Sequence, residues 1–381
     1  MNPKTWIEIS KKNLLHNLGQ FLSRLKPETQ LMAVVKSNAY GHGLESITRI
    51  LHGYNADKTQ KIWFGVDNLD EARVVQKIAP QNPVLVLGYT QNARLSETAK
   101  LGVRITVYNW ETVKALQKLK MQNEKCKILV HVKVETGTTR QGIAEKEVVE
   151  LVKSLNKLKG VKVEGISTHF ADSEDLQSNY ALKQLTRYNS VITRLEGAGI
   201  TTPVRHLACT AATLLYPQTH GNLVRVGLGL YGLWPSSDVR IMNQELGIRK
   251  IELRPVLMWK TIVAQVKEVK KGTPISYDLT ERVPRDSKVA VLPVGYWDGY
   301  ARGLSGIGHV LIQGQRCKVL GRICMNMLMV DVTSIGRVKP EDEVVLIGVQ
   351  GREIVSVDEV AQKLNTINYE VVTRINPLIP R

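Results

Sequence analysis

The first two-thirds of the chain alternates short apolar runs with longer amphipathic stretches. The short runs are rich in Val, Ile and Leu and end at turn residues, which is typical of buried β-strands. They cover Leu31–Lys36, Ile62–Val66, Val84–Gly88, Val103–Tyr108, Ile128–Val134, Val161–His169, Val204–Ala208 and Leu223–Leu228. Helical periodicity fills the intervals at Leu44–Tyr54, Leu69–Ile78, Ala93–Leu101, Trp110–Lys120, Ala144–Leu158 and Ala181–Ala198. Eight strands alternating with helices predict a parallel sheet closed into a TIM (β/α)8 barrel, with a doubly wound open sheet as the alternative.

The pattern changes after about residue 240. Gly-rich turns then separate β-type runs, and only Val357–Leu364 has helical periodicity. The runs cover Pro255–Val269, Lys288–Gly295, His309–Gly321, Met325–Thr333 and Glu343–Gly348. We therefore predict an α/β protein with a barrel domain over residues 11–240 and a β-rich C-terminal domain over residues 241–381. Residues 1–10 contain a further strand, which we expect to pair with the second domain.

Length and composition agree with this division. The chain has 381 residues, enough for two domains with hydrophobic cores, and its 43% hydrophobic and 23% charged content is typical of globular proteins. Its first ten residues lack the apolar core of a signal peptide, and no apolar stretch is long enough for a membrane span. We expect a cytoplasmic protein with no membrane partner.

The charge and the cysteines exclude two further classes. The formal charge is +17, from 52 basic and 35 acidic residues, yet the lysines are interspersed with Glu along helical stretches and no nucleic-acid-binding motif occurs. We therefore expect no nucleic acid partner. Cys126, Cys209, Cys317 and Cys324 form no C-x-x-C pair, so we predict free thiols and no metal site.

Lys36 is the first candidate for chemistry. It closes the first barrel strand and precedes a turn, residues 37–43, that contains Tyr40 and two glycines. A lysine at the end of a buried strand is costly unless it has a partner or a function, and a partly desolvated amine is a nucleophile toward carbonyl groups. The alternative is a lysine that extends from the strand end into water.

Polar residues follow the ends of other barrel strands too. Lys133 and Arg140 end or follow the fifth strand, His169 ends the sixth, and Arg225 lies on the eighth. Since the carboxyl ends of barrel strands converge on one mouth, we expect these side chains to share a site with Lys36.

A phosphate site is expected at the same mouth. Thr210 follows the seventh strand, and Gly227 and Leu228 follow the eighth. Their hydroxyl and backbone N–H groups are suitable phosphate donors, and the loops after strands seven and eight often bind phosphate in barrels. A lysine nucleophile, a phosphate site and a flat histidine together suggest pyridoxal phosphate.

Nine segments, in order over nearly the whole chain, make the interpretation specific. They are Ala33–Gly43, His131–Gly137 with Arg140, Thr168–Phe170, His206–Ala208, Val224–Gly232, Ile275–Tyr277, Gly295–Tyr300, Gly321–Met325 and Thr366–Glu370. Each resembles a motif of the bacterial alanine racemase family, whose members are pyridoxal phosphate enzymes with a barrel and a β-rich domain.

The resemblance implies a role for each matching residue. Lys36 would bind the cofactor covalently and act as one acid/base group, and Tyr277 of a partner subunit would be the other. Arg225 would donate to the pyridine nitrogen, and His169 would lie near the ring. Tyr40, Thr210, Gly227, Leu228 and Tyr369 would hold the phosphate, and Arg140 and Met325 the substrate carboxylate. Tyr296, Arg302 and Arg322 would line the entrance. Lys133 matches a lysine that is carbamylated in some members.

Several positions depart from the family pattern. Cys209 stands where Asn is usual, Asn326 where Asp is usual and Asp278 where Gly is usual. Thr139 and Gln141 flank Arg140 in place of commoner residues. These departures leave the choice of substrate open.

The resemblance implies a homodimer with shared active sites that interconverts L-alanine and D-alanine and supplies D-alanine for peptidoglycan. A serine or broad-specificity racemase of the same fold is the first alternative. A pyridoxal phosphate decarboxylase is the second, and it is disfavoured because that class places an acidic residue where Arg225 stands. A non-catalytic, single-domain cofactor-binding protein is the third, and residues 241–381 with Tyr277 argue against it.

Overall fold

A computed structural model describes residues 3–54, 62–122, 127–245 and 250–381. The chain divides into two compact units. The barrel unit contains Lys12–Ala39 and Ile47–Arg254, and the C-terminal unit contains Met1–Lys11, Tyr40–Ser46 and Pro255–Arg381.

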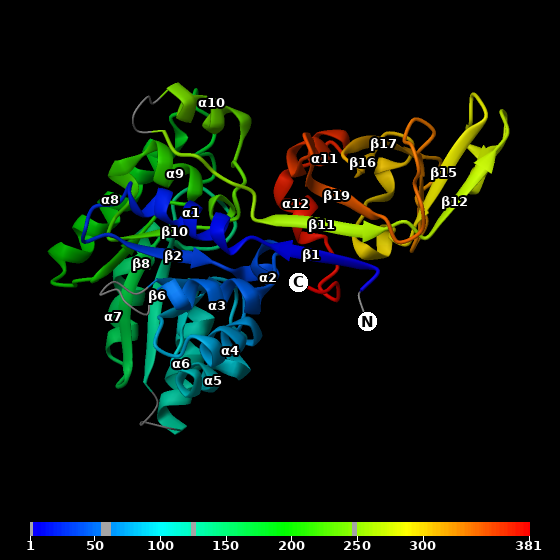
Figure 1. Cartoon of the computed structure of the whole chain (residues 1–381). Helices are drawn as coiled ribbons and strands as arrows, with labels where there is room; N and C mark the ends of the chain where they lie inside the picture. Colours follow the sequence, from blue (N-terminus) through cyan, green and yellow to red (C-terminus); the bar gives the residue numbers. More distant parts are fainter. Residues whose placement is uncertain (1–2, 55–61, 123–126, 246–249) are drawn as a thin grey trace. The chain divides into compact units, whose positions relative to one another are not determined.

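The barrel unit is built on eight parallel strands in the order β10-β2-β3-β4-β5-β6-β8-β9 (Figure 1). They are β2 (Gln30–Val34), β3 (Trp63–Val66), β4 (Val84–Val86), β5 (Arg104–Val107), β6 (Ile128–Glu135), β8 (Val161–Ser167), β9 (Val204–His206) and β10 (Leu223–Val226). A short strand, β7 (Ile143–Ala144), pairs with β6. Backbone bonds from Asn222 N to Arg205 O (3.1 Å) and from Arg225 N to Ala208 O (2.9 Å) link β9 to β10. The predicted eight-stranded TIM barrel is confirmed.

Helices lie between the strands because their apolar residues recur on one face. In α4 (Leu69–Ile78), for example, Leu69, Ala72 and Val75 are buried, three positions apart. The other helices around the barrel are α1 (Lys11–Leu22), α3 (Leu44–Tyr54), α5 (Leu95–Leu101), α6 (Trp110–Gln122), α7 (Val148–Asn156), α8 (Tyr180–Gly197), α9 (Thr210–Leu215) and α10 (Ser237–Glu245). The bounds of α3 and α4 match the prediction, whereas α9 and α10 were not predicted.

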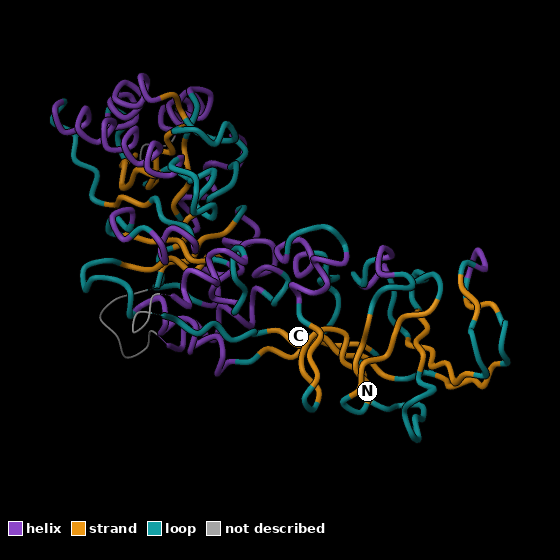
Figure 2. The backbone as a smooth tube through the Cα atoms, turned by 90° about the horizontal axis from the view of Figure 1, so that it is seen from above, coloured by secondary structure: helices purple, strands orange, loops and turns teal. Residues whose placement is uncertain are grey.

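The C-terminal unit is an antiparallel sheet in the order β1-β11-β19-β16-β17-β18-β15-β12, with β20 paired to β19; Figure 2 shows its strands in orange. The strands are β1 (Thr5–Ile9), β11 (Leu257–Ile262), β12 (Gln265–Val269), β15 (Ser287–Leu292), β16 (His309–Ile312), β17 (Gln315–Leu320), β18 (Leu328–Asp331), β19 (Glu343–Gln350) and β20 (Glu353–Val355). A two-stranded ribbon, β13 (Pro274–Ile275) with β14 (Glu281–Arg282), and two helices, α11 (Val357–Lys363) and α12 (Asn368–Thr373), complete it. The separate β-rich domain is confirmed.

Three predicted details of this unit are wrong. The run His309–Gly321 is a hairpin of two strands, β16 and β17. The run Pro255–Val269 forms two strands, because Val263 N bonds to Asp342 O and Ala264 N to Val291 O, so the chain passes from one neighbour to another between β11 and β12. The helix α12 was missed because six residues are too few to show helical periodicity.

Within the described ranges, no helix is both long and apolar enough to cross a bilayer.

Candidate active site

Lys36 begins an unusual turn at the end of β2. The next three residues, Ser37, Asn38 and Ala39, have φ values of 54°, 55° and 52° and ψ values of 54°, 44° and 51°, and Tyr40 has φ 53°. These are left-handed helical angles, which cost non-glycine residues roughly 1–2 kcal/mol each. Such a turn persists only where its surroundings hold it, and strained backbone of this kind clusters at functional sites. None of the four residues is glycine, so nothing in the sequence indicates this conformation.

Arg225 lies on β10 and is buried, with 6% of its surface exposed. Its Nη1 donates to His206 Nδ1 and to His206 O, both at 2.7 Å. Its Nη2 donates to Thr168 O and Leu207 O, both at 2.8 Å, and lies 3.2 Å from His169 Nδ1. Its Nε–H meets no acceptor among the residues that the structure describes. One directional donor of a fixed cation is therefore left for a ligand.

Two buried histidines connect Arg225 to a carboxylate. His206 Nε2 lies 2.8 Å from His131 Nδ1, and His131 Nε2 lies 3.1 Å from Glu164 Oε2, which also accepts from Arg104 Nε at 2.8 Å. A guanidinium only donates, so it assigns His206 Nδ1 as an acceptor and His206 Nε2 as protonated. His131 Nδ1 then accepts, and its Nε2–H donates to Glu164. One chain of donors thus runs from Arg225 to Glu164 through two neutral rings.

Charge and burial are consistent with this assignment. Burial lowers the pKa of His206 well below its ordinary value, with Arg225 adding to the effect, and burial also lowers the pKa of His131. Burial opposes ionisation of Glu164, but the hydrogen bonds from His131 and Arg104 outweigh it and hold its pKa at about 2. Burial lowers the pKa of Arg225 to about 10, which leaves it a cation at neutral pH. We call Arg225, His206, His131 and Glu164 the histidine chain.

Lys133 lies near several other cations. Its Nζ donates to Gln141 Oε1 at 2.9 Å, and Gln141 Nε2 lies 3.4 Å from Leu87 O. Burial, followed by the charges of Arg225 and Arg140 and then of Lys36, lowers the pKa of Lys133 to about 7. Burial, followed by the charges of Arg225, Lys133, Arg140 and Lys36, lowers the pKa of His169 well below its ordinary value. The structure therefore brings together the five strand-end residues predicted to share a site.

The predicted phosphate residues of the barrel also meet. Gly227 N donates to Thr210 Oγ1 at 3.2 Å. Thr210 is the first residue of α9, and Gly227 directly precedes a short 3₁₀ helix, η4 (Leu228–Tyr231). As the first residue of η4, Leu228 has an N–H without an intrahelical acceptor. The Thr210 hydroxyl and the Leu228 N–H are suitable donors to a phosphate. The Lys36 amine can react with an aldehyde, and the Arg225 Nε–H can donate to a ring nitrogen. The barrel residues thus fit a phosphorylated pyridine aldehyde.

Tyr277 lies in the C-terminal unit and is 68% exposed there. It starts η6 (Tyr277–Leu279) between two residues of positive φ, Ser276 at 65° and Asp278 at 61°. Ser276 Oγ donates to Arg322 O at 2.6 Å, and the Asp278 carboxylate lies 3.5 Å from Arg322 Nε and 3.7 Å from Arg302 Nη2. The predicted entrance arginines therefore lie beside the segment that carries Tyr277, and the unusual Asp278 joins them.

Tyr296 and Met325 lie on adjoining segments of the same unit. Tyr296 N donates to Cys324 O at 3.1 Å and Trp297 N to Met325 O at 3.0 Å. A Cβ on Gly295 would overlap Cys324 O, so only glycine allows this approach. Both predicted side chains are substantially exposed, Tyr296 at 42% and Met325 at 55%.

The remaining two predicted phosphate residues, Tyr40 and Tyr369, also belong to this unit. Their ring centroids are 6.2 Å apart. A Cβ on Gly41 would overlap Val372 O in α12, so the glycine after Tyr40 is required for this packing. The two tyrosines are therefore held on adjoining backbone segments.

The role of the histidine chain was missed at the level of sequence. His131 and His206 occur in segments that resemble family motifs, but nothing in the sequence links them to Glu164 or Arg104. Successive side chains of a strand point to opposite faces of the sheet, and this alternation places His131 of β6 inside the barrel. Nothing in the sequence, however, indicates which other strand His131 faces.

Two family models cover most of the chain. Residues 9–235 match the alanine racemase N-terminal domain, and residues 256–381 match the alanine racemase C-terminal domain. An alanine racemase of Methanococcus maripaludis is 38% identical over 377 residues, covering 99% of this chain and 97% of that protein. An alanine racemase of Desulforamulus reducens is 38% identical over 382 residues, covering 100% and 99%.

Solved structures show the same relationship. The alanine racemase of Clostridium difficile 630 has a TM-score of 0.89 at 32% identity, covering 99% of this chain and 94% of that one. The alanine racemase of Bacillus anthracis with bound L-Ala-P has a TM-score of 0.90 at 32% identity, covering 99% and 94%. A histidine racemase of Leuconostoc mesenteroides has a TM-score of 0.87 at 25% identity, covering 100% and 98%. With both domains matched over nearly their whole length, this chain is a member of the alanine racemase family.

Proposed function

We propose that this enzyme is a pyridoxal phosphate-dependent racemase that interconverts L-alanine and D-alanine and supplies D-alanine for peptidoglycan in the cytoplasm. The observation that carries the proposal is the cluster at the barrel mouth. Lys36, Arg140, His169 and Arg225 occur with two phosphate-type donors, the Thr210 hydroxyl and the Leu228 N–H, and no described residue accepts the Nε–H of Arg225.

Racemisation requires one group that removes the α proton and another, on the opposite face, that returns one. Lys36 is the amine that would bind the cofactor and then serve on one face. The partner subunit's Tyr277 would serve on the other. Bound pyridoxal phosphate supplies delocalisation of the carbanion that proton removal creates. The exposure of Tyr277 in its own unit is consistent with a role toward a second copy of the chain.

Other residues would position the reacting groups. Arg225 would donate from Nε to the pyridine nitrogen, and since a guanidinium cannot accept a proton there, that nitrogen would stay unprotonated. His169 would lie against the ring, and Arg140 and the Met325 N–H would bind the substrate carboxylate. The phosphate would be held by Tyr40, Thr210, Gly227, Leu228 and Tyr369.

A mixing experiment tests the two-base assignment and the homodimer together. Lys36→Ala and Tyr277→Phe should each be inactive alone. After subunit exchange at equal amounts, half of the dimers are mixed and each has one intact site, so about a quarter of wild-type activity should return. Two separately labelled preparations of Lys36→Ala, mixed in the same way, are the control. Proven exchange without recovery contradicts a shared site.

Substrate choice is the second part of the proposal. Tyr369, Tyr296 and Met325 favour a small side chain, and one methylene is worth only ~1–3 kcal/mol of discrimination. We expect alanine to have the highest kcat/KM and serine the second highest. A serine or broad-specificity racemase is the competing candidate, because Cys209 and Asn326 depart from the family pattern and the histidine racemase shares the fold.

Chiral chromatography of single-enantiomer amino acids, incubated with the purified enzyme and pyridoxal phosphate, decides between these candidates. Faster racemisation of serine, histidine, lysine or arginine than of alanine contradicts the alanine assignment. Release of CO2 and an amine without racemisation points to the decarboxylase alternative. Cys209→Asn, which restores the usual family residue, should change the ranking if this position determines it.

A further inference from the structure

The left-handed turn after Lys36 is joined to the neighbouring strand end by one carboxylate. Glu71 Oε1 accepts from Asn38 N at 3.2 Å, and Glu71 Oε2 accepts from Asp67 N at 2.8 Å. Asn38 is in the turn that follows β2, and Asp67 is the first residue after β3. Glu71 therefore links the backbones at the carboxyl ends of two adjacent parallel strands, next to the candidate cofactor lysine.

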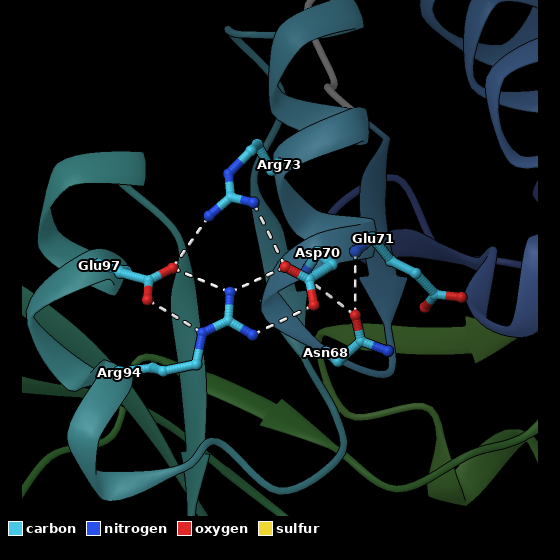
Figure 3. A network of polar contacts seen from close by, with 6 residues as sticks. All are labelled: Asn68, Asp70, Glu71, Arg73, Arg94 and Glu97. Atoms are coloured by element: carbon cyan, nitrogen blue, oxygen red, sulfur yellow. Dashed lines mark hydrogen bonds and ion pairs between the residues drawn. The ribbon is translucent and has the colours of Figure 1, made fainter.

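The position of Glu71 is fixed from its own helix. Asn68 caps α4, and its Oδ1 accepts from Asp70 N and Glu71 N, both at 3.0 Å. Figure 3 shows the Glu71 carboxylate directed away from Arg94, while the neighbouring Asp70 bonds Arg94 at 2.8 Å. A surface ion network thus lies within one residue of Glu71, yet the Glu71 carboxylate accepts from two backbone amides.

The turn needs such an acceptor. Four consecutive residues hold left-handed angles that are unfavourable for residues with a Cβ, and ordinary backbone angles there would carry the chain after Lys36 in a different direction. The strand side is fixed, because Val35 N donates to Gly65 O and Ala39 N donates to Val35 O, both at 2.8 Å. Glu71 adds a charged acceptor at the middle of the turn, and hydrogen bonds to a charged group are the stronger ones.

We propose that Glu71 is a positioning residue for Lys36: its carboxylate holds the left-handed turn and so sets the direction of the lysine amine. The proposal rests on the proposed function of Lys36 and adds a residue that touches neither cofactor nor substrate. Its effect is expected on the reaction step more than on substrate affinity, because misplacing a reacting group by about 1 Å can cost on the order of 100-fold in rate.

The test compares Glu71→Ala and Glu71→Gln with Asp70→Asn. The control removes a carboxylate from the same helix turn but leaves both bonds to Asn38 and Asp67. Hydrogen–deuterium exchange of the full-length protein, with and without pyridoxal phosphate, reports on residues 36–40 independently of activity. Steady-state kinetics with alanine and the absorbance of the lysine-bound cofactor are measured on the same samples.

We expect Glu71→Ala to exchange residues 36–40 at least about 10-fold faster and to lower kcat by roughly 10- to 100-fold with little change in KM. Glu71→Gln should be intermediate, because its amide oxygen can serve only one of the two N–H groups. Asp70→Asn should match wild type in both measurements. The proposal is overturned if Glu71→Ala leaves exchange and kcat at wild-type values, or if Asp70→Asn accelerates exchange equally.

The two proposals fail separately. If wild-type protein shows neither racemisation nor cofactor bound at Lys36, the proposed function fails. Exchange in the cofactor-free protein then still decides whether Glu71 holds the turn. If wild type is active and Glu71→Gln, which retains the fold, matches it in exchange and kcat, only the role of Glu71 is refuted.

Discussion

The histidine chain predicts a pH-dependent loss of stability when Glu164 is replaced by Gln. Glu164 accepts from His131 and twice from Arg104, at 3.1, 2.8 and 3.2 Å. A glutamine of the same shape presents one acceptor oxygen, and its amide nitrogen would face a donor. The free energy of unfolding should therefore fall, because a buried donor loses its acceptor.

The magnitude follows from the pKa of the carboxyl. A pKa held at about 2, against an ordinary value of 4.5, corresponds to at most ~3.4 kcal/mol at 1.36 kcal/mol per unit. The side chain is still 17% exposed, so solvent screening reduces the expected loss to about 2 kcal/mol. Since the pKa is lowered in the folded state, this stability is fully present above pH 4.5 and is lost as the pH falls toward 2.

Urea denaturation of the cofactor-free protein, followed by tryptophan fluorescence at several pH values, measures the difference. Glu164→Gln should unfold about 2 kcal/mol more easily at pH 7, and its difference from wild type should shrink below pH 4.5. Glu196→Gln is the control, because Glu196 forms a half-exposed pair with Arg205 and should change stability by only ~0.5 kcal/mol. A loss at pH 7 of the same size for both variants, or a loss independent of pH, refutes the reasoning.

Two further predictions concern the barrel. Burial lowers the pKa of Lys133 from 10.5 to about 7, so the charged form destabilises the fold below pH 7, and this penalty disappears as the pH rises to 10.5. Lys133→Met should therefore raise the free energy of unfolding by about 2 kcal/mol at pH 7. Urea curves that show the same increase in the free energy of unfolding at pH 10.5 as at pH 7 contradict this. Gly229→Ala should lower the free energy of unfolding by ~1–3 kcal/mol and weaken cofactor binding, because the added Cβ would overlap the Phe21 ring and lie 2.8 Å from Thr210 Cγ2. Gly197→Ala is the control: its added Cβ would have nothing within 4 Å, so it should stabilise helix α8 by about 0.5–1 kcal/mol. Thermal melts and cofactor titrations measure both variants, and equal effects of the two substitutions would exclude the steric explanation.

The sequence determined the architecture through periodicity. Apolar runs of β-type composition gave all eight barrel strands, and the change to Gly-rich β runs gave the second domain. It also predicted that Lys36, His169 and Arg225 lie together, because residues at the ends of parallel strands meet at one mouth of a barrel. These features depend on local pattern and on topology, both of which a single chain displays.

Tertiary structure alone decided how those residues are held. The left-handed turn at residues 37–40 contains no glycine, so its conformation depends on hydrogen-bond acceptors elsewhere in the fold. Two of these acceptors are Gly65 O and the Glu71 carboxylate, which lie 29 and 35 positions after Lys36 in the sequence. The histidine chain joins residues from neighbouring strands, and its tautomers follow from a guanidinium that can only donate. Hydrogen-bond partners that are remote in sequence leave no periodic signal, which is why the sequence predicted only the candidate site residues and the fold alone determined how they are held.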